Sequence, residues 1–98
     1  MQERLYNAIG LCMKAGKCQS GAFAVEKAIR SGKAKLVLLE TSASEATKEQ
    51  YRTMCEARNV PFYVVETVGR AIGKESRIVM CVTDGAFVKM ILGALPTT

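Results

Sequence analysis

Apolar residues in the first third of the chain recur at the spacing of helical faces. The first such face has the three- and four-residue repeat of an amphipathic helix, in Leu5, Ala8, Ile9, Cys12 and Met13. This repeat predicts a helix over about residues 2–15, which Gly16 ends in a left-handed conformation. Residues 17–20 then read as a short extended link. Ser20 is expected to cap a second helix over about residues 21–31.

The second helix is predicted to bury one side and to end at Gly32. That apolar side comprises Ala22, Val25, Ala28 and Ile29. Three short runs elsewhere are almost wholly apolar and favour strands, at residues 35–39, 62–65 and 78–82. Such runs are typical of strands that are covered on both faces.

Further helices are expected between and after these strands. The sequence Ser-Ala-Ser-Glu at residues 42–45 matches a capping box for a third helix that runs to about Arg58. This helix is predicted to bury Thr47, Tyr51, Met54 and Cys55, and Asn59 is its expected left-handed terminator.

Two more helices complete the prediction. Thr67 is expected to cap a short helix over residues 68–72, which Gly73 closes. Asp84 is expected to cap a final helix that Pro96 stops. The apolar side of this last helix is Phe87, Val88, Ile91, Leu92 and Leu95.

The alternation of helices with short apolar strands predicts a three-layer α/β/α sandwich with a small mixed sheet of about four strands. A length of 98 residues suits one domain over residues 1–98. No apolar run approaches the roughly 20 residues that span a bilayer, and the first residues lack the apolar stretch of a secretion signal. A cytoplasmic protein without a membrane partner is therefore expected, and we expect it to be a monomer.

Composition argues against metal and catalytic sites. The chain has four cysteines without C-x-x-C spacing and no histidine, so we expect neither a metal nor another cofactor. Three of the four cysteines fall on predicted apolar faces, where they serve as small hydrophobes. Cys18 follows Lys17 and precedes a helix, which favours a low pKa, but no general base accompanies it. The glycines of residues 69–73 are wrongly spaced for a phosphate loop, and we expect a protein that is not an enzyme.

The positive charge is concentrated in one stretch. Residues 14–35 contain six Lys/Arg and one acid, and thus carry a net charge of +5, which is that of the whole chain. A basic block around the start of a helix favours a polyanion, because helix N-termini and lysines both attract phosphate. The alternative is an ordinary solvated basic face. Phe23 likewise has two interpretations, as a ring that stacks on an exposed base or as a staple or core residue.

Four segments together resemble the kink-turn-binding ribosomal proteins, the L-seven-Ae and L-thirty-e family, and especially its short bacterial YlxQ-like branch. They are AGKCQSGAFAVEKAIRSGKAKLVLL at residues 15–39, CEARNVP at 55–61, VGRAIGK at 68–74 and VTDG at 82–85. The resemblance implies an α/β/α fold that binds sharply bent RNA with tandem sheared G·A pairs. Structured RNA, ribosomal or kink-turn-like, is the implied partner, with the ribosome as a further one and no DNA specificity.

The resemblance also implies where RNA contacts the chain. In the family, G-x-N-E-x-x-K begins the second helix, whose Asn and Glu read the G·A pairs while Lys meets the backbone. Gly21 and Lys27 match this motif, but Phe23 and Ala24 occupy the Asn and Glu positions. The predicted RNA contacts are Lys17, Gly21, Ala22, Phe23, Ala24, Lys27, Arg30, Lys33, Arg70, Arg77, Thr83 and Gly85. A protein-interaction module on the same fold is the alternative, favoured by an apolar patch around Phe23 without converging lysines.

Overall fold

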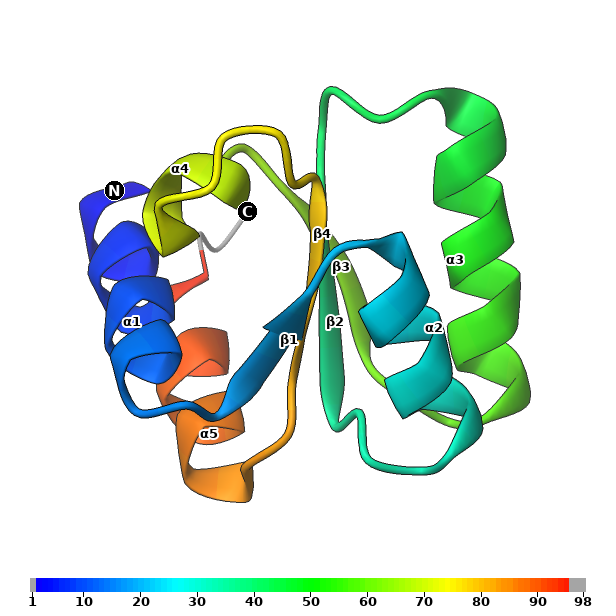
Figure 1. Cartoon of the computed structure of the whole chain (residues 1–98), viewed down its shortest axis with the longest axis horizontal. Coiled ribbons are helices and arrows are strands. Elements are labelled where there is room, and N and C mark those ends of the chain that lie inside the picture. The colour runs from blue at the N-terminus through cyan, green and yellow to red at the C-terminus, as the bar shows by residue number, and fades with distance from the viewer. Residues whose placement is uncertain (1, 96–98) are drawn as a thin grey trace.

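The computed structural model describes residues 2–95 as five helices and a four-stranded sheet. In chain order the elements are α1 (Gln2–Lys14), β1 (Cys18–Ser20), α2 (Ala22–Arg30), β2 (Leu36–Glu40), α3 (Glu45–Ala57), β3 (Phe62–Val65), α4 (Gly69–Ile72), β4 (Val79–Val82) and α5 (Gly85–Ala94). Helices lie on both faces of the sheet, with α1, α4 and α5 on one side and α2 and α3 on the other (Figure 1). The predicted three-layer sandwich is therefore confirmed.

The sheet has the strand order β1-β4-β2-β3 and is mixed, as predicted. β2 pairs with β3 in parallel, and β4 pairs with both β1 and β2 in antiparallel register. The segment expected as an extended link is thus an edge strand, in which Cys18 lies opposite Val82 and Ser20 opposite Met80. β3 forms the other edge, so Tyr63 is partly exposed rather than covered on both sides.

The alternation of side chains along the central strands divides the core between the two faces. Leu36, Leu38 and Met80 pack toward α1 and α5, in a cluster with Leu5, Ile9 and Ile91. Val37, Leu39 and Cys81 pack toward α2 and α3, in a cluster with Val25, Ile29, Tyr51 and Cys55. Both faces of the sheet are thus covered, which explains why β2 and β4 are almost entirely apolar.

Several predicted helix ends are confirmed. Gly16, Gly32 and Gly73 have φ angles of 70°, 80° and 76°, and Asn59 has a φ of 57°. Each lies in the left-handed region that ends a helix. Asp84 caps α5, because its carboxylate accepts hydrogen bonds from the backbone N–H groups of Ala86 and Phe87 at 3.1 and 3.2 Å.

Ser20 does not cap α2, contrary to the prediction. The N-cap is Gly21, and no side chain in residues 2–95 caps this helix. Ser20 belongs instead to β1, where its hydroxyl and carbonyl oxygens accept hydrogen bonds from Arg77 at 2.7 and 3.1 Å. The prediction that Ala22 faces inward is also wrong, since it is exposed at the first position of the helix.

The predicted caps of α3 and α4 are also corrected. Ser44, not Ser42, caps α3 by accepting the Thr47 N–H at 3.1 Å, while the Ser42 hydroxyl donates to Glu40. Thr67 does not cap α4. That role falls to Glu40, whose carboxylate accepts the N–H groups of Val68 and Gly69 at 2.9 and 3.3 Å. One acidic side chain at the end of β2 therefore fixes the start of α4.

A few residues are less buried than the sequence predicts. Thr47 and Met54 are half-buried, and Leu92 on α5 is exposed. Pro96, the expected stop of the last helix, lies outside the described residues. Within residues 2–95, none of the helices has the length and apolar character needed to cross a bilayer.

Candidate functional site

Helix α2 presents two different sides. Val25, Ala28 and Ile29 are buried against the sheet and hold the helix in place. Phe23 and Lys27 lie one turn apart on the outer surface, and the Phe23 side chain is 80% exposed. Phe23 is therefore neither a staple nor a core residue. Leaving a phenyl ring in water forgoes the roughly 1.5–3 kcal/mol that burial of such a side chain provides.

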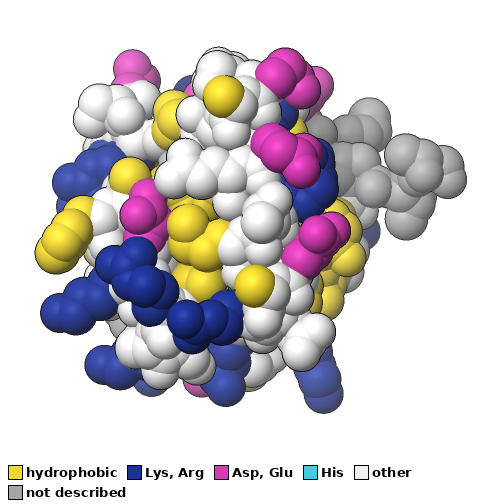
Figure 2. All heavy atoms as spheres, turned by 90° about the vertical axis from the view of Figure 1, so that its right-hand side faces the viewer, with side chains coloured by type: hydrophobic (Ala, Val, Ile, Leu, Met, Phe, Trp, Pro, Cys, Tyr) yellow, Lys and Arg dark blue, Asp and Glu magenta, His cyan; other side chains and the backbone are white. Residues whose placement is uncertain are grey.

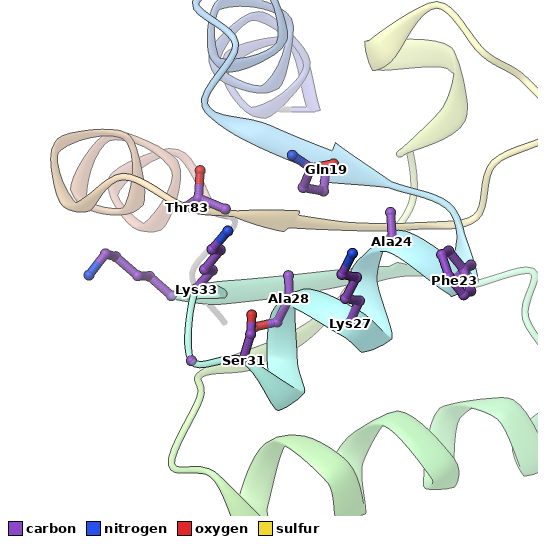
Figure 3. A pocket seen from close by; sticks show the side chains of 10 residues that line it. Gln19, Phe23, Ala24, Lys27, Ala28, Ser31, Lys33 and Thr83 are labelled. Carbon is purple, nitrogen blue, oxygen red and sulfur yellow. The ribbon is translucent and has the colours of Figure 1, made fainter.

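A groove of about 710 Å³ runs between α2 and the neighbouring ends of the sheet strands. Its lining comes from four separate segments, namely β1, α2, the loop before β2 and the end of β4. The lining residues are Gln19, Phe23, Ala24, Lys27, Ala28, Ser31, Gly32, Lys33, Lys35 and Thr83. Phe23 lies at one end of the groove, and Lys33 and Thr83 lie at the other (Figure 3).

Sheet pairing brings the distant segments of the groove together. The Thr83 N–H donates to the Lys17 carbonyl oxygen at 2.9 Å, and the Thr83 hydroxyl donates to the same oxygen at 3.1 Å. The Lys35 N–H donates to the Val82 carbonyl oxygen at 2.8 Å. The end of β4 therefore holds Thr83 between Lys17, which precedes β1, and Lys35, which precedes β2.

The charged side chains that line the groove are all positive. Lys27, Lys33 and Lys35 are exposed, and the described residues that line the groove include no carboxylate. On the face of α2 and α3, Lys and Arg side chains gather toward the lower left, while acidic side chains lie mainly toward the upper right (Figure 2). A hollow lined by cations with one exposed aromatic ring suits an anionic ligand that also has flat apolar surfaces.

Five of the predicted contact residues line this groove: Phe23, Ala24, Lys27, Lys33 and Thr83. Lys17 lies beside it through its hydrogen bonds with Thr83. The other five lining residues were missed by the sequence prediction, namely Gln19, Ala28, Ser31, Gly32 and Lys35. Lys35 is part of the charged stretch 14–35, and it precedes β2, which begins at Leu36.

Three other predicted residues lie at the N-terminus of α2, away from the groove. Gly21, Ala22 and Arg77 line a separate hollow of about 460 Å³, next to Glu26 and Tyr51. The Arg77 guanidinium is engaged by Ser20, and a side chain at Gly21, which has a φ of 89°, would approach that guanidinium to 3.3 Å. Arg77 therefore fixes the turn between β1 and α2 and does not point into the groove as a free cation.

The last three predicted residues lie farther away. Arg30 is paired with Glu26 at 3.8 Å, which weakens its attraction for an external anion. Arg70 is exposed on α4 in a third hollow, which it shares with Glu3, Tyr6 and Glu66. Gly85 is exposed at the start of α5 and does not line the groove.

Tyr51 and Cys18 are among the titratable groups outside the groove that have shifted pKa values. Burial, followed by the Glu26 carboxylate that accepts the Tyr51 hydroxyl at 3.3 Å, raises the pKa of Tyr51 to about 12. Interaction with the Cys12 thiol lowers the pKa of Cys18, which packs partly buried against the α1 and α5 core cluster. Cys18 therefore belongs to the opposite face of the sheet from the groove.

Comparison with known proteins identifies related chains over nearly the whole length. The profile of the ribosomal protein L7Ae/L30e/S12e/Gadd45 family matches residues 3–91. The RNA-binding protein YlxQ of Bacillus subtilis (strain 168) is 41% identical over 90 residues, which cover 89% of this chain and 90% of that protein. The large ribosomal subunit protein eL30 of Dictyostelium discoideum is 34% identical over 88 residues, covering 85% of this chain and 79% of that protein.

A solved structure has the same architecture. A protein of unknown function from Bacillus halodurans C superposes with a TM-score of 0.86 at 31% identity, covering 93% of this chain and 95% of that one. The resemblance inferred from the four sequence segments is thereby confirmed at the level of family and fold.

Proposed function

Since the chain belongs to the ribosomal protein L7Ae/L30e/S12e/Gadd45 family, we propose that it is a non-catalytic protein that binds structured RNA in the groove beside α2. The observation that carries this proposal is the convergence of Lys27, Lys33 and Lys35 on one hollow whose described lining includes no carboxylate. The relative from Bacillus subtilis is named as an RNA-binding protein, which supports the same class of ligand.

The chemistry of the groove suits the sugar-phosphate backbone. The lysines neutralise phosphates, and the exposed Gln19 amide donates to phosphate or sugar oxygens. Contacts of this kind fix the position of the RNA and depend little on its sequence.

Kink-turn or ribosomal RNA is the structured RNA that we propose as the ligand. The relative from Dictyostelium discoideum is named as a protein of the large ribosomal subunit, which makes ribosomal RNA a natural candidate. Phe23 and Ala24 offer no acceptor to a guanine, so we expect the bend of the RNA to matter more than the identity of G·A pairs. We propose that the protein binds this RNA as a monomer in the cytoplasm and without a cofactor.

A protein partner is the weaker candidate. An apolar patch around Phe23 without cations would favour it, but Lys27 is its neighbour one turn along the helix and two further lysines line the same groove. The exposed ring is therefore part of a basic surface, which suits nucleic acid better than an apolar protein face.

Lysine variants test the proposal through the salt dependence of binding. If three lysines each neutralise one phosphate, affinity falls about 40-fold between roughly 50 and 200 mM salt. Lys27→Ala and Lys35→Ala should each lower the slope of log affinity against log salt by about 0.9, for all RNAs alike. The matched control is Lys89→Ala, an exposed lysine of α5 in the opposite helical layer, which should leave the slope unchanged.

The measurement is a titration of kink-turn RNA, matched duplex RNA and duplex DNA at two salt concentrations. Failure of the wild-type protein to bind any RNA at low salt refutes RNA binding. Equal losses in Lys27→Ala and Lys89→Ala would place the binding surface elsewhere on the protein.

A further inference from the structure

Phe23 is the most exposed large apolar side chain in the described part of the protein. Its 80% exposure compares with 36–51% for the other exposed large apolar residues, which include Leu11 and Tyr63. The fold gives no reason for a phenyl ring at this position, because the inward side of α2 is supplied by Val25, Ala28 and Ile29. An aromatic ring at this site therefore requires an explanation outside the packing of the chain.

The surroundings of the ring define what can cover it. Ala24 and Ala28 follow Phe23 along the groove, and their small side chains leave the hollow open (Figure 3). Lys27 lies one turn farther along the same surface of α2, so a cation is next to the ring. A ligand at this end of the groove thus meets an apolar face and a positive charge together.

We propose that Phe23 is a stacking platform for an unpaired nucleobase of the bound RNA, while Lys27 independently binds a phosphate of the RNA backbone. This inference rests on the proposed function and adds the class of RNA, namely a helix interrupted by an unstacked base. Neither Phe23 nor Ala24 has a side-chain hydrogen-bonding group, so the pair cannot read base edges. An aromatic face accepts every base, with modest preference for those that stack most strongly.

Only some parts of an RNA can present the apolar face of a base to a protein. Bases within a continuous helix are stacked on both sides, and only their edges and the backbone reach a protein. A ring at the end of a phosphate-binding groove makes full contact only where a base has left the stack. The selectivity comes from stacking, while the lysines give affinity for any RNA.

Three RNAs distinguish the effect of a base stacked on Phe23 from the effect of the flexible bulge that carries the base. The first is a duplex with one unpaired adenine, the second is the same duplex without the bulge, and the third has an abasic nucleotide in the bulge. The wild-type protein should bind the adenine bulge about 5- to 150-fold more tightly than the abasic bulge, as expected for one base stacked on an aromatic ring. Fluorescence anisotropy at one fixed salt concentration measures all three affinities.

The variant that tests the platform is Phe23→Ala. Because the ring is 80% exposed and alanine favours helices, this variant should fold as the wild type does. It should bind all three RNAs as the wild type binds the abasic bulge. Lys27→Ala should weaken all three equally and keep the preference, and the control Leu11→Ala, an exposed apolar residue of α1 in the opposite helical layer, should change nothing.

The outcomes distinguish the inference from the function on which it rests. Binding of all three RNAs with equal affinity by the wild type, unchanged in Phe23→Ala, overturns the stacking platform and leaves RNA binding intact. No binding of any of the three RNAs at low salt overturns both.

Discussion

Among the glycines of the described residues, Gly69 is the one where the fold leaves the least room for a side chain. A Cβ atom there would lie 2.5 Å from the Arg77 carbonyl oxygen, 2.7 Å from that of Lys74 and 3.0 Å from that of Glu75. All three neighbours are backbone atoms, so no side-chain rotation relieves the contact. Gly69→Ala must therefore displace the loop over residues 74–77, which carries the arginine that holds Ser20.

The size of the effect follows from two opposing contributions. Overpacking of a close contact typically costs about 1–3 kcal/mol and sometimes more, and two of these contacts are shorter than 3.0 Å. Gly69 is the first residue of the four-residue α4, so the preference of helix interiors for alanine offsets little of this cost. We expect Gly69→Ala to lower the free energy of unfolding by about 2–3 kcal/mol. For a domain of this size that corresponds to a fall in Tm of about 10–20 °C.

Urea and thermal unfolding of the purified variants measure the difference. The matched control is Gly93→Ala on α5, because nothing lies within 4 Å of a Cβ atom at that exposed position. It should raise the free energy of unfolding by about 0.5–1 kcal/mol, as the helix gains a better former. A Gly69→Ala protein as stable as Gly93→Ala would refute the close approach of residues 74–77 to the start of α4.

Two further predictions concern the titratable groups. Because interaction with the Cys12 thiol lowers the pKa of Cys18, and because the other three cysteines are buried, iodoacetamide should modify Cys18 first at neutral pH. Mass spectrometry of the labelled peptides tests this, and earlier labelling of any buried cysteine would contradict it. The pKa of Tyr51 is raised from 10.0 to about 12, so its contribution to stability is complete below pH 10 and is lost as the pH rises toward 12. Urea unfolding across this range should show a shallower fall for Tyr51→Phe than for the wild type, and parallel curves would exclude a raised pKa.

Much of the fold could be predicted because its signals are local. The repeat of apolar residues along α1 and the glycine that follows it specify a helix and its end within one stretch of chain. The continuous apolar runs of β2 and β4 likewise reflect burial on both faces, which no exposed segment would tolerate. Asp84 was identifiable as a cap because its partners are the next few backbone groups.

The features that were missed depend on residues far apart in the sequence. β1 is a strand only because β4 pairs with it, and its three residues show no apolar alternation of their own. Ser20 has the side chain of a helix cap, but its hydroxyl is engaged by Arg77, 57 residues away. Glu40 caps α4 from the end of another strand, across 28 residues.

The groove itself was only partly predictable for the same reason. Lys27 and Phe23 share a helix, so their proximity follows from helical spacing. Thr83 and Lys35 meet only through the pairing of β4 with its neighbours, and Gln19 faces the groove only because β1 is a strand. Composition identified the charged stretch, but the sheet determined which of its lysines converge.

The central claim is that RNA binds in the groove between α2 and the sheet ends. Mapping of backbone amide shifts by NMR during titration with an RNA duplex that contains one unpaired adenine tests it most directly. We expect no changes on the exposed side of α1 around Leu11, and we expect the largest changes at Gln19, Phe23, Lys27, Lys33 and Thr83. Changes concentrated around Leu11 and Met90, with the groove unaffected, would contradict it.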